Sequence, residues 1–306
     1  MTASNAIDAA VGVLGERARL GVEIGALTTY RVGGRAAVFV VAESAEDLRL
    51  VTTARTVSGL DVLVLGRGSN MLVADRGFSG IVVTLGAGFE RIDVTATRVV
   101  AGGGVRLPVL ARATAAAGLT GLEWAVGVPG SVGGGVRMNA GGHGSDIAAT
   151  LVGVRVVDLR TGEDEEMPAS ALGLEFRRSA LHDDDVVVAA TFDLASGDRV
   201  RSEQEIADIV RWRREHQPGG QNAGSVFVNP LPESAGAIID RLGLRGTRIG
   251  TARVSEKHAN FIQADEGGSA DDVRSVMELV RSKVLDATGI RLRSEVRLVG
   301  FDEAAS

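Results

Sequence analysis

The sequence contains no cysteine, which excludes disulfides, thiolate metal ligands and cysteine nucleophiles. It has only four histidines, and they lack the spacing of metal ligands, so we do not expect a zinc site or any other metal site. These are His143, His182, His216 and His258. The N-terminal segment has neither the basic start nor the compact apolar run of a signal peptide, and no apolar run approaches membrane-spanning length. We therefore expect a cytoplasmic protein.

Basic residues are outnumbered by acidic ones, with 33 Lys and Arg against 39 Asp and Glu and a net charge of −6. This balance argues against nucleic acid or an anionic membrane surface as a partner, although a local basic pocket for a phosphorylated small molecule remains open. The 306 residues, 45% of them hydrophobic, fit a globular chain of two or three domains. The composition does not indicate the oligomeric state, and a monomer is the default expectation.

Residues 127–144, GVPGSVGGGVRMNAGGHG, carry eight of the chain's 41 glycines. Glycine loses the most conformational entropy on folding and brings no side chain to pack, so this density disfavours a packed helix or strand. The interleaved valines and Pro129 distinguish the stretch from a flexible linker. Exposed N–H groups in such a loop can bind an anion, and we predict a cofactor loop that holds phosphates or a flat ring.

A second glycine loop, GRGSN at 66–70, directly follows the apolar run DVLVL. It begins like a dinucleotide-binding fingerprint, but Met71 occupies the position of the third glycine, and strand-like residues follow in place of a helix. The chain has no GK[ST] segment either, which excludes a P-loop. We predict a strand–loop–strand element that offers backbone N–H groups and the Ser69 hydroxyl to a phosphate. A plain tight hairpin is an equally supported alternative.

The first two thirds of the chain alternate between predicted helices and short strands. Helical periodicity and N-capping residues predict helices over 5–18, from Ser44 onward and over 106–117. Short apolar runs predict strands at 37–41, 61–65, 81–85, 91–94, 98–101, 152–159 and 186–194.

The last third has a different character. Ser202 with Glu205, and Ser269 with Asp272, have the spacing of capping boxes, so we predict that each serine opens a helix. A further helix is predicted over about 233–242. The final segment, 291–300, alternates between apolar and charged residues and predicts a strand with Glu295 on its arginine-rich face.

Three short segments contain residue types that can act in catalysis. Arg177 and Arg178 follow a predicted strand, Ser225 lies in a glycine-flanked loop, and Glu295 lies among arginines. Taken singly, each is better explained as a surface ion pair or a turn residue.

Together with the glycine loops, these segments resemble the UDP-N-acetylenolpyruvoylglucosamine reductases, the MurB family. The resemblance extends in order from about residue 27 to 301 and looks like the shorter subclass, which lacks an inserted tyrosine loop. It rests on VLGRGSNMLVADRGFSGIVV (64–83), LTGLEWAVGVPGSVGGGVRMNAGGHG (119–144), FRRS (176–179), NAGSVFVNP (222–230), GTARVSEKHANFI (250–262) and SEVRLVG (294–300).

The resemblance implies an α+β fold: a two-subdomain FAD-binding unit of the vanillyl-alcohol oxidase (p-cresol methylhydroxylase) type, with a C-terminal α+β substrate-binding domain. The implied division is 1–85 for the first subdomain, with a C-terminal strand 290–306 returning to it, 86–199 for the second, and 200–289 for the substrate domain. It also implies that NADPH reduces non-covalently bound FAD, which reduces the enolpyruvyl group of a UDP-sugar to the lactyl group of UDP-N-acetylmuramate, in peptidoglycan synthesis.

The resemblance also implies roles for residues. Arg177 would hold the substrate carboxylate, Ser225 would donate a proton, and Glu295 would help to stabilise the enol. The residues implied to bind FAD are Gly66, Arg67, Gly68, Ser69, Asn70, Gly127, Pro129, Gly130, Ser131, Val132, Gly133, Asn139, Ala140 and Gly141. Those implied to bind the substrate are Arg213, His216 and Asn229.

The sequence departs from the family pattern at several positions. Phe176 replaces a tyrosine, His216 stands where a lysine is common, Val228 replaces lysine or glutamine, and Gly135 replaces alanine. Two alternatives therefore stay open: a flavin oxidase of the same superfamily acting on another substrate, and a binding protein that has lost turnover.

Overall fold

The structure, a computed structural model, describes residues 2–302. Met1 and residues 303–306, the end of the predicted returning strand, lie outside the described residues. The chain folds into two compact units. Unit 1 contains the chain up to Leu20, Ala37–Arg67 and Ser79–Arg213, and unit 2 contains Gly21–Ala36, Gly68–Phe78 and the chain from Arg214 onward.

Helices and strands are mixed along the chain, which confirms the predicted α+β class. The α-helices are α1 (Ala3–Leu14), α2 (Ala45–Ser58), α3 (Leu107–Ala116), α4 (Val132–Arg137), α5 (Arg199–His216), α6 (Ala235–Arg241) and α7 (Ala270–Thr288). The strands are β1 (Arg19–Leu20), β2 (Ala36–Ala42), β3 (Val62–Val64), β4 (Met71–Val73), β5 (Phe78–Leu85), β6 (Ile92–Thr95), β7 (Arg98–Gly102), β8 (Leu119–Thr120), β9 (Gly141–Gly142), β10 (Ser145–Asp146), β11 (Leu151–Asp158), β12 (Asp164–Pro168), β13 (Asp185–Asp193), β14 (Ala195–Ser196), β15 (Arg248–Ile249), β16 (Ala252–Val254), β17 (Ile262–Ala264) and β18 (Arg297–Val299).

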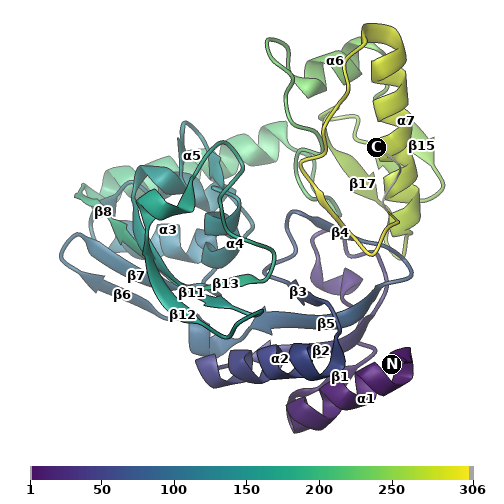
Figure 1. The fold of residues 1–306 in the computed structure, drawn as a ribbon. Coiled ribbons are helices and arrows are strands. Elements are labelled where there is room, and N and C mark those ends of the chain that lie inside the picture. Colours follow the sequence, from purple (N-terminus) through teal and green to yellow (C-terminus); the bar gives the residue numbers. More distant parts are fainter. Residues whose placement is uncertain (1, 303–306) are drawn as a thin grey trace. The chain divides into compact units, whose positions relative to one another are not determined.

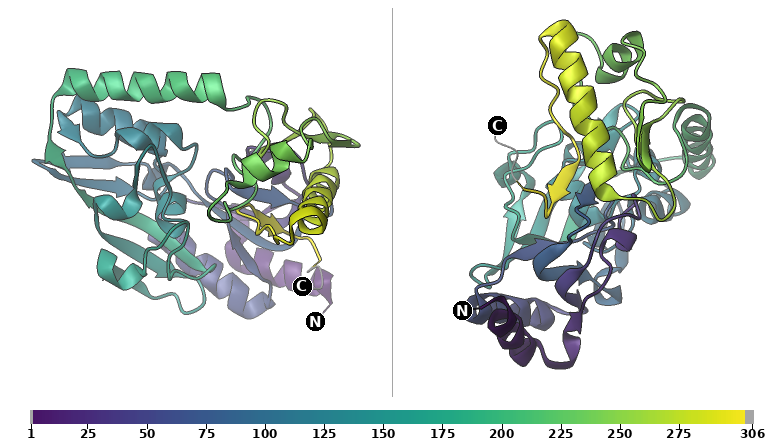
Figure 2. Two further views of the ribbon diagram at one scale, coloured as in Figure 1. Left: turned by 90° about the horizontal axis from the view of Figure 1, so that it is seen from above. Right: turned by 90° about the vertical axis from the view of Figure 1, so that its right-hand side faces the viewer.

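Unit 1 is built on two sheets. The first has the strand order β1-β2-β5-β3, and α1 and α2 lie together along one of its faces (Figure 1). Leu14 of α1, Leu48 of α2 and Val40 of β2 are buried in their common core. The second sheet is antiparallel, with the order β12-β11-β13-β7-β6. Its core is shared with apolar side chains of α3, α4 and α5, and α5 is one straight helix (Figure 2).

Unit 2 has a small antiparallel sheet, β15-β16-β17, against which α7 packs (Figure 1). The apolar stripe of α7 at helical spacing, including Val273, Met277 and Val280, is fully buried there. The C-terminal strand β18 pairs in parallel with β4, so Leu298 lies opposite Leu72. This pairing joins the end of the chain to the segment that follows the GRGSN loop. Of the helices within residues 2–302, none is long and apolar enough to cross a membrane.

Most of the predicted elements are confirmed, but the start of α5 is not the predicted one. The helix begins at Arg199, so Ser202 lies inside it and does not cap it. The Ser202 hydroxyl donates instead to Glu123 Oε1, 2.6 Å away, in a contact that is buried in unit 1. The prediction was wrong because Asp198 caps the helix in its place, with its Oδ1 accepting from the Arg201 N–H at 2.8 Å. Ser44 and Ser269 do cap α2 and α7 as predicted.

The glycine-rich stretch also differs from the prediction, because Val132–Arg137 within it forms the short helix α4. A Cβ atom on Gly133 would lie 3.0 Å from the carbonyl oxygen of Val187 in β13, and one on Gly135 would lie 3.2 Å from Leu107. The missing side chains thus let α4 approach its neighbours closely. Glycine is used here for packing as well as for turns.

The predicted strand 291–300 is shorter in the structure, where only Arg297–Val299 is regular. Its alternation holds only in the first part, where Leu292 and Val296 are buried and Arg291 and Arg293 are exposed. In β18 itself Val299 is buried and Leu298 is half-buried, so the predicted period of two is not kept there. The predicted division of the chain into three domains stays a prediction.

Candidate active site

The two glycine loops meet in unit 1. Gly66 follows β3 and is exposed, and a Cβ atom on it would lie 3.0 Å from Ser131 Oγ. Ser131, which is buried, caps α4 by accepting a hydrogen bond from the Gly134 N–H. The approach of the loops is therefore built into the fold of this unit.

The rest of the GRGSN loop belongs to unit 2. Gly68 has φ of +59°, and a Cβ atom there would lie 2.5 Å from the Cα of Thr28. Asn70 donates from Nδ2 to the carbonyl oxygen of Glu295, at 3.0 Å. Arg67 is exposed, and Ser69 is half-buried. This part of the loop thus requires glycine and is tied to the segment that carries a predicted catalytic residue.

The glycine stretch offers fewer free backbone groups than the sequence indicates. The N–H groups of Val132 and Gly133 donate to the carbonyls of Val105 and Gly103, at 2.8 and 2.9 Å. The N–H of Ala140 donates to Gly135, and the carbonyl of Gly130 accepts from Leu107. These hydrogen bonds hold α4 in place. The groups that make them would therefore contact a ligand by close packing and not by donating hydrogen bonds to it.

The residues of unit 1 still fit a flavin nucleotide. Gly66, Pro129 and Gly134 are exposed, and the Cβ side of Gly142 faces open space. A flat or phosphorylated group can therefore come close to bare backbone on these loops.

Asn139 is only 3% exposed, and all of its amide is engaged by the chain. Its Nδ2 donates to the Glu175 carbonyl (3.0 Å) and to Asp146 Oδ2 (3.2 Å), and its Oδ1 accepts from the Ala148 N–H (3.0 Å).

Arg177 lies in a tight turn of unit 1 that Glu175 and Arg178 close by exchanging backbone hydrogen bonds of 3.0 and 3.1 Å. Its φ of +55° is unusual for a side chain as large as arginine. Its guanidinium donates from Nη2 to the Gly141 carbonyl, at 2.7 Å, and lies 5.0 Å from the centre of the exposed Phe176 ring. The turn therefore presents a fixed cation beside the glycine stretch.

Ser225 and Glu295 come from segments that lie side by side in unit 2. The Glu295 N–H donates to the Val226 carbonyl at 2.8 Å, and the Val228 N–H donates to Arg293 at 3.0 Å. Both Ser225 and Glu295 are half-buried.

Asn260 is a site residue to which the sequence analysis assigned no role. It is 3% exposed, and its side chain binds both backbone groups of Phe227, accepting from the N–H at 3.0 Å and donating to the carbonyl at 2.8 Å. Its own carbonyl accepts from the Val226 N–H. The only signal in the sequence was its place in the motif GTARVSEKHANFI.

The predicted substrate-binding residues are spread over both units. In unit 1, Arg213 donates from its guanidinium to the Gly127 carbonyl, and burial lowers the pKa of Arg213. In unit 2, His216 is exposed at the end of α5, and exposed Asn229 accepts from the Ala235 N–H at the start of α6.

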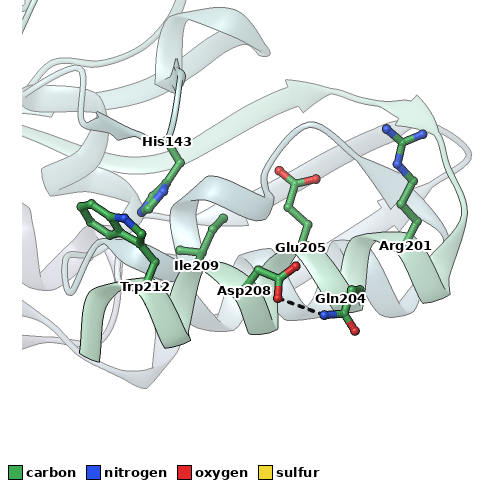
Figure 3. A pocket seen from close by; sticks show the side chains of 7 residues that line it. All are labelled: His143, Arg201, Gln204, Glu205, Asp208, Ile209 and Trp212. Atoms are coloured by element: carbon green, nitrogen blue, oxygen red, sulfur yellow. Dashed lines mark hydrogen bonds between the residues drawn. The ribbon is translucent and has the colours of Figure 1, made fainter. Parts of the chain in front are cut away.

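A cavity of about 490 Å³ lies along α5 in unit 1 (Figure 3). It is lined by His143, Arg201, Gln204, Glu205, Asp208, Ile209 and Trp212. The His143 ring meets the Trp212 ring edge to face, with centroids 5.1 Å apart. Burial and then the nearby Arg213 lower the pKa of His143, while Glu205 opposes them, so the imidazole is neutral at pH 7. The cavity contains none of the predicted site residues. No metal-binding group of acidic and histidine side chains is found in residues 2–302.

Comparison with known proteins identifies two matching regions. The family model "UDP-N-acetylenolpyruvoylglucosamine reductase, C-terminal domain" matches residues 216–299, and the model "FAD binding domain" matches residues 36–167. The reductase from Bacillus pumilus is 34% identical over 89% of this chain and 91% of its own length. That from Heliobacterium modesticaldum is 41% identical over 89% of this chain and 88% of its own length.

A solved structure extends the similarity to the fold. UDP-N-acetylenolpyruvylglucosamine reductase from Thermus caldophilus has a TM-score of 0.81 and 32% identity, covering 92% of this chain and 99% of its own. This similarity and the FAD-binding match confirm the predicted fold class. Ser225 and Glu295 lie inside the segment that the C-terminal model matches, and Arg177 lies outside both matched segments.

Proposed function

Because the chain belongs to the UDP-N-acetylenolpyruvoylglucosamine reductase family, we propose that Arg177, Ser225 and Glu295 are its catalytic residues. The chain is an FAD-dependent oxidoreductase that uses NADPH to reduce UDP-N-acetylglucosamine enolpyruvate to UDP-N-acetylmuramate, a step of peptidoglycan synthesis. Both NADPH and nucleotide sugars are metabolites of the cytoplasm, and we propose that the protein works there.

Bound FAD supplies the hydride that NADPH provides. The residues that would hold it are those of the two glycine loops, namely Gly66 to Asn70, Gly127 to Gly133, and Ala140 with Gly141. Asn139 is not among them, because its amide is engaged within the chain. Support comes from the approach of Gly66 to Ser131 and from the exposed backbone around them. Because several N–H groups of the second loop are already bonded within the chain, its contribution is a close-fitting surface.

Arg177 would bind the carboxylate of the enolpyruvyl group. When hydride reaches the far carbon of the double bond, negative charge develops on the neighbouring carbon and on that carboxylate. A guanidinium held in one place stabilises this charge more than it stabilises the substrate, which lowers the barrier. The guanidinium carries five N–H donors, one of which binds the Gly141 carbonyl.

Ser225 would donate the proton that completes the reduction at the carbon next to the carboxylate. A hydroxyl is a weak acid and transfers a proton only to a strong base, and an enolate is such a base. Glu295 would stabilise the enol form of the substrate in the same step.

The observation that carries the assignment is the pairing of the Ser225 and Glu295 segments through Val226. A proton donor and a carboxyl group placed on adjacent segments can act on one substrate atom. Arg213, His216 and Asn229 are proposed to bind the rest of the UDP-sugar. The oxidase alternative is not favoured, because the similarity to the reductases includes the C-terminal domain.

The decisive experiment follows the visible spectrum of the enzyme reduced with NADPH in the absence of oxygen. Adding the enolpyruvyl UDP-sugar should restore the oxidised flavin spectrum and yield UDP-N-acetylmuramate. If the reduced flavin instead ignored the UDP-sugar and reacted rapidly with oxygen, the protein would be an oxidase. A purified, folded protein that carried no flavin would contradict the assignment altogether.

A further inference from the structure

The backbone turn that carries Arg177 is hydrogen-bonded to one buried side chain, that of Asn139. The Glu175 carbonyl, at the base of the turn, accepts from the Arg178 N–H inside the turn and also from Asn139 Nδ2, at 3.0 Å. The second of these bonds ties the turn to the glycine stretch.

The same amide is also linked, through Asp146, to the other anchor of Arg177. Asn139 Nδ2 lies 3.2 Å from Asp146 Oδ2, and Asp146 is the register partner of Gly141 in the β9–β10 hairpin. Gly141 supplies the carbonyl that accepts from the Arg177 guanidinium. A third bond, from the Ala148 N–H to Asn139 Oδ1, closes the far end of this hairpin segment. A single amide therefore binds the backbone anchor of Arg177 directly and is linked to its side-chain anchor through Asp146.

The backbone of Asn139 is suited to this place. Its φ is +38°, a region that asparagine and glycine adopt more readily than other residues. Since every polar atom of the amide is used within the chain, none is left to bind a cofactor in the way expected from the sequence.

We propose that Asn139 is a positioning residue that fixes Arg177 for the reduction of the enolpyruvyl group. This inference rests on the proposed role of Arg177 as the residue that binds the substrate carboxylate. Asn139 acts through Arg177 and not through the flavin. Displacing the guanidinium by about 1 Å would lower the rate of reduction by on the order of 100-fold, so even a small relaxation of the turn would slow the reaction.

The test separates the two half-reactions by rapid mixing. In Asn139→Asp the Oδ1 acceptor and the side-chain shape remain, but the donors to Glu175 and Asp146 are lost. Reduction of the flavin by NADPH should stay within about twofold of the wild type, because it does not use the substrate carboxylate. Reoxidation by the enolpyruvyl UDP-sugar should slow by about 10-fold to 100-fold. Asn5→Asp, an exposed change of the same kind on α1, should leave both rates unchanged.

A double-mutant cycle with Arg177→Lys shows whether the effect passes through Arg177. If it does, Asn139→Asp should cost little more in the Arg177→Lys background, because the group that it positions is already gone. Additive losses would overturn the proposal, as would a loss of flavin or an equal slowing of flavin reduction by NADPH. Should Asn139→Asp fail to fold, Asn139→Gly removes the amide in a residue that accepts the backbone angle. The Arg177→Lys variant alone tests the underlying function, since wild-type turnover in it would contradict the role of Arg177 whatever Asn139 does.

Discussion

The backbone N–H of Glu295 donates a 2.8 Å hydrogen bond to the carbonyl of Val226, the residue that follows Ser225. Phe227 and Ser294 form a bridge next to it, so the two segments run antiparallel at this point. Any shift of the Glu295 segment therefore moves the serine loop as well. Within unit 2 the proposed proton donor and the proposed carboxyl group are positioned as one piece.

Ser225→Ala should separate the two half-reactions of the enzyme. Flavin reduction by NADPH should be unchanged, and turnover of the enolpyruvyl group should fall by at least about 100-fold, as expected for loss of a general acid. Anaerobic stopped-flow absorbance measures both steps. Ser275→Ala, which removes an exposed hydroxyl on α7, is the matched control. If both steps slowed together in Ser225→Ala, the serine would not be the proton donor.

The buried contact between Ser202 and Glu123 should stabilise unit 1 in a pH-dependent way. Burial alone would raise the pKa of Glu123, but hydrogen bonds from Ser202, Thr120 and the Gly121 N–H outweigh it and hold the pKa below its usual value. A carboxyl group whose pKa is lowered by folding adds stability above the pKa of the unfolded chain. That stability is lost as the pH falls through the folded pKa.

We therefore expect Ser202→Ala to lower the free energy of unfolding by about 1.5–3 kcal/mol at pH 7, the range for a hydrogen bond to a charged group. The difference from the wild type should shrink as the pH falls below about 4, where Glu123 is protonated in the unfolded chain. Urea unfolding followed by circular dichroism measures it, with the exposed Ser282→Ala as the control. A deficit that did not change with pH would show that the charge of Glu123 is not involved.

The elements that the sequence predicts well are those whose signals are local. Ser44 and Asp47 make a capping box with each other, and Ser269 accepts from the N–H of Asp272, so the pattern and its partners lie within one turn. Ser202 has the same spacing to an acidic residue, but its hydroxyl binds Glu123 from a distant part of the chain. The Ser-to-acidic spacing is the same in all three, but Asp198 accepts from the Arg201 N–H and takes the capping position of α5, which leaves Ser202 inside the helix to bind Glu123.

In the candidate site too, the contacts between segments distant in the chain could not be predicted from the sequence. The sequence indicated two glycine loops and a serine, an arginine and a glutamate. It could not show that the Asn139 amide donates to the Glu175 carbonyl, or that the Asn260 amide donates to the carbonyl of Phe227. Both asparagines act through partners more than thirty positions away, as their separations of 36 and 33 residues show.

Adjacent glycines of α4 should respond in opposite ways to the same substitution. In Gly133→Ala the new Cβ would lie 3.0 Å from the Val187 carbonyl and force α4 away from β13, so we expect a loss of about 1–3 kcal/mol of unfolding free energy. In Gly134→Ala the Cβ has only an ordinary contact with Ser131 Oγ, at 3.5 Å. That variant should gain up to about 1 kcal/mol from helix propensity. Thermal unfolding of both variants checks the contrast, and equal effects would show that α4 does not pack against β13 this closely.

Replacing Tyr30 with phenylalanine should stabilise the folded protein. It is the single tyrosine of the chain, it is fully buried, and its hydroxyl has no hydrogen-bond partner in residues 2–302. An unsatisfied buried hydroxyl costs about 1–3 kcal/mol, so Tyr30→Phe should raise the free energy of unfolding at pH 7 by about 1 kcal/mol. Urea unfolding measures the change, and a decrease in its place would show that the hydroxyl is satisfied in the native protein.

The same hydroxyl should make the stability difference between the wild type and Tyr30→Phe depend on pH above pH 10. Burial raises the pKa of Tyr30 above its ordinary value of 10.0, because the phenolate is not solvated in the core. Above pH 10 the unfolded chain therefore releases a proton that the folded chain keeps, and the wild type loses stability by about 1.4 kcal/mol per pH unit from this group. Tyr30→Phe lacks this loss, so its advantage should widen between about pH 10 and pH 11. Since the chain has one tyrosine, tyrosinate absorbance should appear only as the protein unfolds, and its appearance in the folded protein would contradict the burial of the hydroxyl.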